Sequence, residues 1–345
     1  MILLVLILLT LSGYLLLRWI SWTPGASYRG PLPPLSPEER EIERNLRRHV
    51  EALAGRIGER HVWRCETIKR AERYLREELQ ALGYPVNADG QESFNCPACN
   101  LEVSVPGERD GIVVFGAHYD TVYGSPGAND NGSGVAALLE LARLFRDQKP
   151  ERTVRFLFFV NEEAPFFGSS EMGSYRYAQR AKRRGERIVA MFSLETMGYF
   201  TDEPKSQRFP FPLLRFFYPT TGDFIGFVTN IGSRSLMHAA IAAFRRHANF
   251  PSEGIAAPTL GPLSPVAWSD HWAFWKAGYP AVMVTDTAFL RYPHYHRPSD
   301  TPEKLTYDRL ARVVWGLFHL LLELATPHDS EGEGQPDRGD PPVAP

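Results

Sequence analysis

Between Ser36 and Ala325 the sequence alternates between short apolar segments and longer amphipathic ones, and this alternation restricts the fold more than any other feature. The apolar segments are strand-like and cover residues 101–105, 112–116, 154–160, 189–194, 224–228 and 281–284. The amphipathic segments have helical spacing and cover residues 37–53, 66–82, 134–145, 169–181, 233–247 and 306–324. Several of the strand-like segments are apolar on both faces, which is typical of a sheet covered by helices on each side. The pattern predicts an α/β fold, a three-layer α/β/α sandwich around a mostly parallel mixed sheet.

The two ends of the chain differ in composition from this central domain, which is predicted to cover residues 36–325. Residues 2–17 carry no charge and approach the roughly 17–25 residues that cross a bilayer. Residues 1–22 are therefore predicted to be a membrane anchor, with a cleaved signal peptide as the alternative. Residues 326–345 are rich in proline, glycine and acidic residues, so a disordered tail is predicted there. Long irregular stretches within 200–265 predict a lid-like insertion.

The charge balance of the chain restricts its partners. Lys and Arg together number 38, and Asp and Glu together number 40, which gives a net charge of −2. Nucleic-acid binding draws most of its affinity from basic residues that neutralise phosphates. Nucleic acid is therefore not expected as a partner.

Residues able to bind metal ions follow the predicted strands at the points where those strands end. His118 and Asp120 follow 112–116, Glu162 and Glu163 follow 154–160, and Glu195 follows 189–194. In an open α/β sheet, ligands bind at the carboxyl ends of the strands. Alone, each of these residues is explained as well by a core histidine or a loop carboxylate, but their common position at one sheet edge predicts a functional site.

Two further residues extend this set. Asp130 lies in a Gly/Asn-rich turn before the helix at 134–145, and His296 follows the last predicted strand. If Asp130, Glu162, Glu163 and Glu195 converge, their mutual repulsion needs a compensating positive charge. Two Zn²⁺ ions supply that charge, and two histidines with three carboxylates are suitable ligands for a zinc pair. One carboxylate of the adjacent Glu162–Glu163 pair then remains free to act as a general base.

Five sequence motifs resemble one known family, the dinuclear-zinc aminopeptidases of metallopeptidase family 28, which also includes glutaminyl cyclases. The motifs read HYD at 118–120, PGANDNGSGVAALLELARLF at 126–145, NEEAPFFGS at 161–169, SDHWAFWKAGYPAVMVTDT at 269–287 and YHRPSDT at 295–301. The resemblance covers residues 66–324 and implies a zinc-exopeptidase-like fold with two zinc ions per chain. It implies these ligands: His118 and Glu195 for one zinc, Glu163 and His296 for the other, and Asp130 as the bridge.

The resemblance also implies roles beside the metals. Glu162 resembles the general base, Asp120 the carboxylate that fixes the tautomer of His118, and Tyr295 a phenol that stabilises the oxyanion in some members. The chain departs from many members by having Glu195 where they have Asp. The longer side chain retains a carboxylate ligand but shifts the zinc or the backbone relative to members that have Asp.

The cysteines suggest no additional metal site. Cys96 and Cys99 form a CxxC motif, but a zinc knuckle needs a second pair, and Cys65 is the one cysteine that remains. A local disulfide between Cys96 and Cys99, or two free thiols, is expected.

The predicted function is a zinc-dependent aminopeptidase that hydrolyses the N-terminal residue of peptides with a free N-terminus, through a metal-bridging water and Glu162. The alternatives are a glutaminyl cyclase and a membrane-anchored protein that keeps the fold without catalysis. The catalytic domain is expected outside the cytoplasm, although Arg18 directly after the apolar segment favours the opposite orientation.

Overall fold

The computed structural model describes residues 2–93 and 95–326 and contains one eight-stranded mixed sheet in the order β1-β2-β4-β3-β5-β8-β6-β7. The strands are β1 (Asn87–Ser93), β2 (Cys96–Val105), β3 (Arg109–His118), β4 (Arg152–Phe159), β5 (Ile188–Glu195), β6 (Ile225–Thr229), β7 (Ser252–Ala256) and β8 (Ala281–Thr285). Strands β4, β3, β5 and β8 are parallel neighbours, and β6 pairs with β7 in parallel. Strands β1 and β2 join one side antiparallel, and the β6–β7 pair joins β8 antiparallel. The prediction of a mostly parallel mixed sheet is confirmed.

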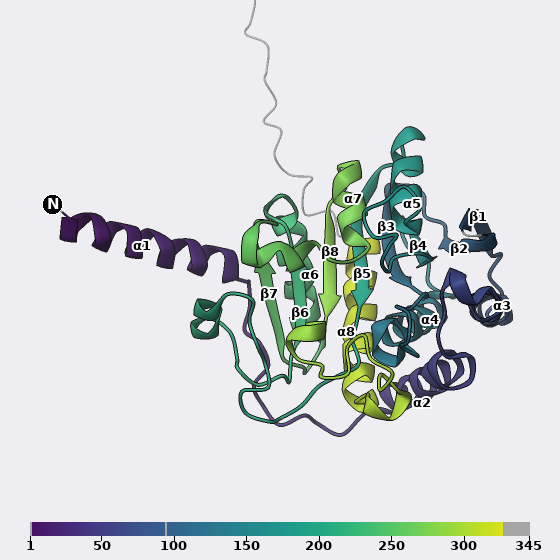
Figure 1. Cartoon of the computed structure of the whole chain (residues 1–345), viewed down its shortest axis with the longest axis horizontal. Helices are drawn as coiled ribbons and strands as arrows, with labels where there is room; N and C mark the ends of the chain where they lie inside the picture. Colours follow the sequence, from purple (N-terminus) through teal and green to yellow (C-terminus); the bar gives the residue numbers. More distant parts are fainter. Residues whose placement is uncertain (1, 94, 327–345) are drawn as a thin grey trace, which may run out of the picture.

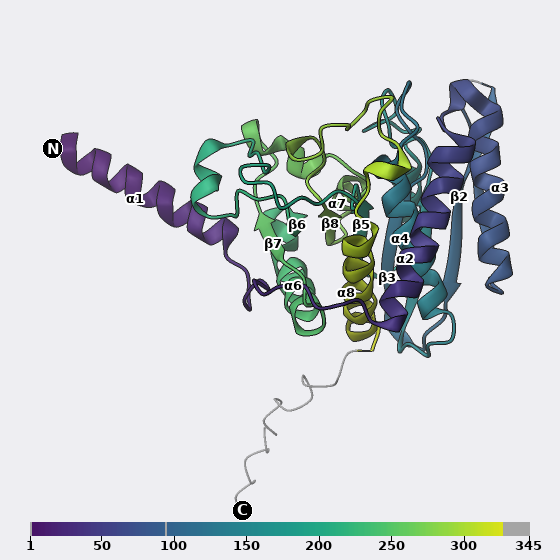
Figure 2. The same cartoon turned by 90° about the horizontal axis from the view of Figure 1, so that it is seen from below.

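Helices cover both faces of this sheet, which confirms the α/β/α sandwich (Figures 1 and 2). The helices of the body are α2 (Pro37–Val50), α3 (Cys65–Ala81), α4 (Gly134–Phe145), α5 (Gly173–Arg183), α6 (Arg234–His247), α7 (His271–Ala277) and α8 (Tyr307–Ala325). Residues of α2, α3, α4, α6 and α8 belong to the large core cluster, and residues of α5 and α7 belong to a smaller one on the other face. Alternate residues of β5 divide between the two clusters, because successive side chains of a strand point to opposite faces.

Three elements of the fold were not predicted from the sequence. Strand β1 reads NADGQES and has no apolar face, since it lies at the edge of the sheet. Strand β7 reads SEGIA and has one large apolar residue, and helix α7 has seven residues, so neither gives a clear apolar pattern. Within the segment 200–265, the predicted strand and helix are present as β6 and α6, and β7 is an additional strand. Its irregular parts are residues 201–224, with a short 3₁₀ helix at Pro212–Phe216, and residues 257–265, which run into a second 3₁₀ helix at Gly261–Ala267.

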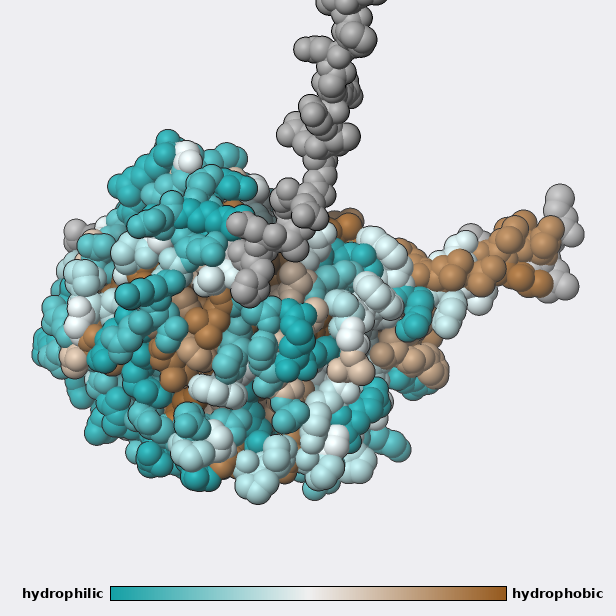
Figure 3. All heavy atoms as spheres, turned by 180° about the vertical axis from the view of Figure 1, so that it is seen from behind, coloured by the Kyte–Doolittle hydropathy of each residue, from teal (hydrophilic) through white to brown (hydrophobic). Residues whose placement is uncertain are grey.

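The N-terminal helix α1 (Ile2–Ser21) extends away from the body beside β7 (Figure 1). Most of its described apolar side chains are exposed, and Figure 3 shows them as a hydrophobic arm. The C-terminal part of α1 contacts the body, where Leu17 and Ile20 pack against Ala257 and Val266. Among the described residues, no helix meets the length and apolarity needed to cross a bilayer, whereas the sequence predicts a membrane anchor in residues 1–22. The location of the domain stays a prediction, and the predicted tail lies outside the described residues apart from its first residue.

The expected pairing of the cysteines is wrong. Cys65 forms a disulfide with Cys96, with their Cα atoms 5.5 Å apart, and Cys99 is free. Cys96 and Cys99 both lie in β2, where residues three apart point to opposite faces and have Cα atoms roughly 10 Å apart. That distance is too long for a disulfide. Cys65, the first residue of α3, is brought to Cys96 because α3 packs on β2.

Candidate metal centre

The predicted site residues lie at one edge of the sheet, where the parallel strands β3, β4, β5 and β8 end. His118 is the last residue of β3 and Glu195 the last of β5, and Glu162 and Glu163 follow β4 by a few residues. The backbone turns sharply at these strand ends. Asn161, which precedes Glu162, has φ of 60°, and Thr196, which follows Glu195, has φ of 43°. Positive φ in residues other than glycine is costly and is concentrated at functional sites.

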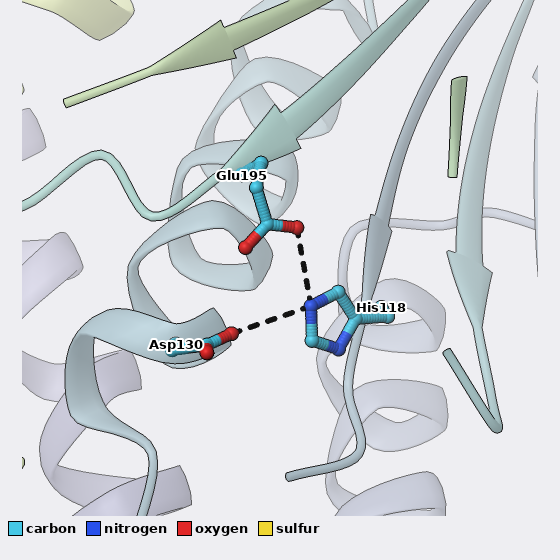
Figure 4. A group of neighbouring side chains, drawn as sticks. All are labelled: His118, Asp130 and Glu195. Atoms are coloured by element: carbon cyan, nitrogen blue, oxygen red, sulfur yellow. Dashed lines mark ion pairs between the residues drawn. The ribbon is translucent and has the colours of Figure 1, made fainter. Parts of the chain in front are cut away.

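One group of side chains contains His118, Asp130 and Glu195, and their ligand atoms lie within 4.8 Å of one another. The Nε2 atom of His118 is 3.4 Å from Oδ1 of Asp130 and 3.2 Å from Oε2 of Glu195. Figure 4 shows both carboxylates directed toward the same ring nitrogen. All three side chains are buried.

A second group contains Asp130, Glu163 and His296, and it shares Asp130 with the first. The Nε2 atom of His296 is 2.9 Å from Oδ2 of Asp130 and 3.4 Å from Oε1 of Glu163. The two carboxylate oxygens of Asp130 therefore face different histidines. This arrangement suits a carboxylate that bridges two cations.

The donor atoms of this site lack ordinary partners. His118 Nε2 and both carboxylate oxygens of Asp130 are buried side-chain atoms without a hydrogen bond, although charged partners lie nearby. A buried polar atom without a hydrogen bond is unfavourable unless something else satisfies it. Imidazole nitrogens and carboxylate oxygens are the donors that zinc binds in catalytic sites. The residues present thus fit a pair of zinc ions.

The pKa values of the cluster indicate an excess of negative charge. Burial raises the pKa of Glu195 to about 7 and raises the pKa of Glu163 as well. Burial alone would lower the pKa of His296, but its contacts with Asp130 and Glu163 raise that pKa to about 10. Groups that retain protons in this way occupy a negative environment, in which divalent cations can replace the protons.

Glu162 lies beside the metal-type groups and belongs to neither of them. Its Oε2 atom is 3.8 Å from His118 Nε2, and burial raises the pKa of its carboxyl group well above the usual range. Tyr295 also lies at the site, with its ring stacked on that of His296 at 3.9 Å between centroids. Burial raises the pKa of the Tyr295 phenol well above 10, with a further contribution from the surrounding carboxylates. A neutral phenol can donate a hydrogen bond.

Asp120 is adjacent to His118, but its contacts differ from the predicted role. Its carboxylate Oδ1 is 3.6 Å from His118 Nδ1, which is too long for a hydrogen bond, whereas its backbone oxygen is 3.2 Å from that nitrogen. The carboxylate instead accepts backbone N–H groups of Glu162 at 3.2 Å and Glu163 at 3.1 Å. Asp120 thus holds the backbone of the Glu162–Glu163 pair in position.

Four further residues support the site and were given no role from the sequence. Ser269 donates a hydrogen bond to Glu195, and the carboxylate of Asp300 accepts the backbone N–H groups of Asn129 and Asp130. Both residues belong to sequence motifs named above, Ser269 to SDHW and Asp300 to YHRPSDT. The spacing of residues within a motif does not show which atoms form hydrogen bonds. Asp270, in the first of these motifs, is fully buried and has no hydrogen bond to its carboxylate oxygens.

The fourth supporting residue, Arg60, is a buried cation beside the acidic cluster. Its guanidinium group donates to the backbone oxygens of Tyr119, Pro126 and Gly127, and so ties together the loop between His118 and Asp130. It also partly offsets the negative charge there. Arg60 lies outside the family motifs, and no periodic or motif signal identifies it.

The sequence and the structure both match known proteins. The model of peptidase family M28 matches residues 100–321. The chain is 34% identical over 297 residues to protein YfbL of Escherichia coli K12, which is described as uncharacterized; the match covers 84% of this chain and 90% of YfbL. The chain belongs to peptidase family M28. Leucine aminopeptidase 1 of Arthroderma otae is 24% identical over 283 residues, covering 74% of this chain and 68% of that protein.

Solved structures of other enzymes share the fold. A zinc aminopeptidase from Bacillus subtilis matches with a TM-score of 0.63 at 16% identity, covering 84% of this chain and 96% of that one. The glutaminyl cyclase of Porphyromonas gingivalis matches with a TM-score of 0.60 at 21% identity, covering 82% of this chain and 98% of that one. At these identities the fold alone is shared, so aminopeptidases and cyclases are both structural neighbours of this M28 peptidase.

Proposed function

We propose that this M28 peptidase is an aminopeptidase that binds two zinc ions per chain and removes the N-terminal residue of peptides. The observation that carries the proposal is the position of Asp130, whose two oxygens face His118 in one group and His296 in the other. Glu195 and Glu163 complete the two groups. When bound, zinc would supply Lewis-acid chemistry, polarising a carbonyl and lowering the pKa of water.

Glu162 is proposed to be the general base. It lies within 3.8 Å of His118 Nε2, yet it is a member of neither metal-type group, so its carboxylate is free to accept a proton from the attacking water. Proton acceptance by a positioned carboxylate typically contributes roughly 10²–10⁴-fold to a rate. The same carboxyl group can then return the proton to the leaving amine. Asp120 fixes the backbone of Glu162 and so fixes the direction of this side chain.

Tyr295 is proposed to donate a hydrogen bond to the oxygen of the scissile carbonyl as negative charge develops there. Its phenol stays protonated because burial raises its pKa. Its ring is held against His296 by stacking, which limits its motion. A preorganised donor of this kind stabilises a transition state more than a ground state.

The negative environment of the site also supports a preference for substrates with a free α-amine. The cluster contains four buried carboxylates, those of Asp130, Glu162, Glu163 and Glu195. An ammonium group is the natural counter-charge for the negative potential that remains after metal binding. A bound α-amine places the first peptide bond at the site, which makes cleavage proceed from the N-terminus, one residue at a time.

The test compares a dipeptide amide with its N-acetyl form, using an internally quenched peptide as the control for endopeptidase activity. The free amine should be cleaved with a much higher kcat/KM, because orientation of the reacting bond can lower the barrier by several kcal/mol. Equal turnover of the free and acetylated forms would contradict the proposal. Ring closure of an N-terminal Gln without peptide cleavage would instead identify a glutaminyl cyclase.

A further inference from the structure

An apolar cavity of about 130 Å³ opens beside the metal centre and extends across the sheet toward β7. Glu195 and Tyr295 line its inner end. The irregular stretch 201–224 covers it with Phe209, Leu214 and Tyr218. The hydroxyl of Tyr218 donates a hydrogen bond to the backbone oxygen of Gly254 in β7, which fixes this cover to the edge of the sheet.

The register of the sheet shows where the cavity leads. Glu195 in β5 pairs with Thr285 in β8, Thr285 pairs with Gly226 in β6, and Gly226 pairs with Glu253 in β7. These four residues form one row across four neighbouring strands, and all four line the cavity. With strands about 4.8 Å apart, the Cα atoms of Glu195 and Glu253 are roughly 14 Å apart. Gly226 has no side chain, so the middle of the row stays open.

Glu253 is the carboxylate at the far end of this row, and its charge is poorly compensated. Besides burial, the groups that act on it are Arg245, the Ser27 hydroxyl and Arg29, which lower its pKa, and Asp223, which raises it. The guanidinium of Arg245 donates instead to backbone and hydroxyl oxygens: those of Thr23, Pro24, Gly25 and Ser252. The largest effect on Glu253 is burial, which raises its pKa. A cation placed next to this carboxylate would therefore be stabilised.

The two ends of the cavity thus have different chemistry. At the inner end, the carboxylate of Glu195 is already engaged by His118 and by the Ser269 hydroxyl. The walls between are mainly apolar, with Val228, Ile255 and Met283 on the floor. At the outer end stands the carboxylate of Glu253. A side chain that fills such a space has a long apolar stem and a positive tip, which describes lysine and arginine.

We infer that the cavity receives the first side chain of the substrate, and that Glu253 makes this enzyme prefer peptides whose N-terminal residue is Lys or Arg. The inference rests on the proposed aminopeptidase function and names its substrate class. Glu253 is a specificity-determining residue in this account, and it lies too far from the metal centre to touch the reacting bond.

The test compares lysine p-nitroanilide with norleucine p-nitroanilide, because the two side chains differ only by the terminal amine of lysine. The zinc-loaded wild-type enzyme should hydrolyse the lysine substrate with a kcat/KM roughly tenfold or more above that of the norleucine substrate, since a site built for a polar group discriminates against its absence. Glu253→Gln should remove most of this difference and bring the lysine-to-norleucine ratio of kcat/KM toward one, because the variant loses the ion pair with lysine but keeps the shape of the side chain. The matched control is Asp223→Asn, which changes a neighbouring carboxylate outside the cavity lining and should preserve the preference.

Calorimetry of free lysine and free norleucine with the wild-type protein supplies a second readout that needs neither turnover nor a folded variant. Lysine should bind roughly tenfold more tightly than norleucine, in line with the kinetic preference. Equal binding of the two, or a lysine-to-norleucine kinetic ratio that Glu253→Gln leaves unchanged, would overturn the inference. If neither p-nitroanilide is hydrolysed while lysine still binds more tightly, the proposed function fails and the assignment of the cavity stands.

Discussion

The hydroxyl of Ser269 donates a hydrogen bond of 2.7 Å to Oε2 of Glu195, the same oxygen that lies 3.2 Å from His118 Nε2. Ser269 is completely buried, and its hydroxyl is also 2.9 Å from that of Ser193. Glu195 has one more methylene group than aspartate and so has more rotamers to restrict. The serine pair restricts them by fixing one carboxylate oxygen.

Ser269→Ala should therefore weaken metal binding at the group formed by His118, Asp130 and Glu195. Loss of a residue that orients a ligand typically lowers metal affinity roughly 10–100-fold. The measurement is a competition titration with a zinc chelator. Ser193→Ala is the matched control, because it removes the hydroxyl next to Ser269 and leaves the hydrogen bond from Ser269 to Glu195. It should lower zinc affinity less than Ser269→Ala does. Equal zinc affinity in Ser269→Ala and wild type would contradict this role.

The adjacent residues Glu162 and Glu163 should give opposite phenotypes. Glu162→Gln should retain both metal ions and lower kcat by roughly 10²–10⁴-fold, the usual contribution of a general base. Glu163→Gln should lower zinc occupancy, since its Oε1 atom is directed toward His296. Metal analysis and steady-state kinetics on both variants distinguish the two roles. An exchange of the phenotypes would reverse the assignment of base and ligand.

The centre of the fold was predicted from the sequence, and the residues that the sequence predicted for the site lie close together, for one physical reason. Parallel strands buried on both faces give continuous apolar segments, and His118, Glu162 and Glu195 stand out where those segments end. Residues that act through precise contacts carry no such signal. Asp120 was expected to orient His118, yet its carboxylate holds the backbone of Glu162 and Glu163.

Elements at the margins of the fold were harder to predict. Edge strand β1 has no apolar face, and β7, which reads SEGIA, has one large apolar residue. The disulfide of Cys65 depends on how α3 packs on β2, which is a tertiary contact that spacing alone does not encode. The row from Glu195 to Glu253 follows from the order β5-β8-β6-β7, and this order is not apparent from the linear sequence.

The stability of the protein should fall as the pH decreases from 6.5 toward 4, in part because of His271. Burial lowers the pKa of His271 to about 4, and its Nε2 atom is 2.7 Å from the backbone oxygen of Val266. Between the folded value and the unfolded value of about 6.5, the unfolded state binds a proton that the folded state does not. At pH 5 this difference in proton binding lowers the free energy of unfolding by about 2 kcal/mol.

His271→Gln should reduce the loss of unfolding free energy between pH 7 and pH 5 by about that amount, whatever its effect at pH 7. Denaturant unfolding of both proteins at the two pH values measures this. The metal ligands are the same in both proteins, so metal-dependent changes cancel in the comparison. An identical pH-dependent loss in the two proteins would show that His271 does not contribute.

The disulfide between Cys65 and Cys96 should stabilise the attachment of α3 to β2. The bond closes a loop of 31 residues, and Cys65→Ser should lower the free energy of unfolding by about 3–4 kcal/mol on the loop-entropy model. Cys99→Ser is the control, since Cys99 is free, and it should change stability by less than about 1 kcal/mol. The measurement is denaturant unfolding with and without reductant, and an equal effect of the two substitutions would contradict the pairing.

The most direct test of the account is a titration of the metal-free protein with zinc while hydrolysis of an aminoacyl p-nitroanilide is followed. Asp130 faces both histidines, so activity should be absent without metal and should rise to a plateau at two zinc ions per chain. The bound zinc should be measured in the same samples, so that activity and stoichiometry are compared directly. Full activity in exhaustively demetallated protein, or a plateau at one zinc ion per chain, would contradict the two-zinc aminopeptidase proposed here.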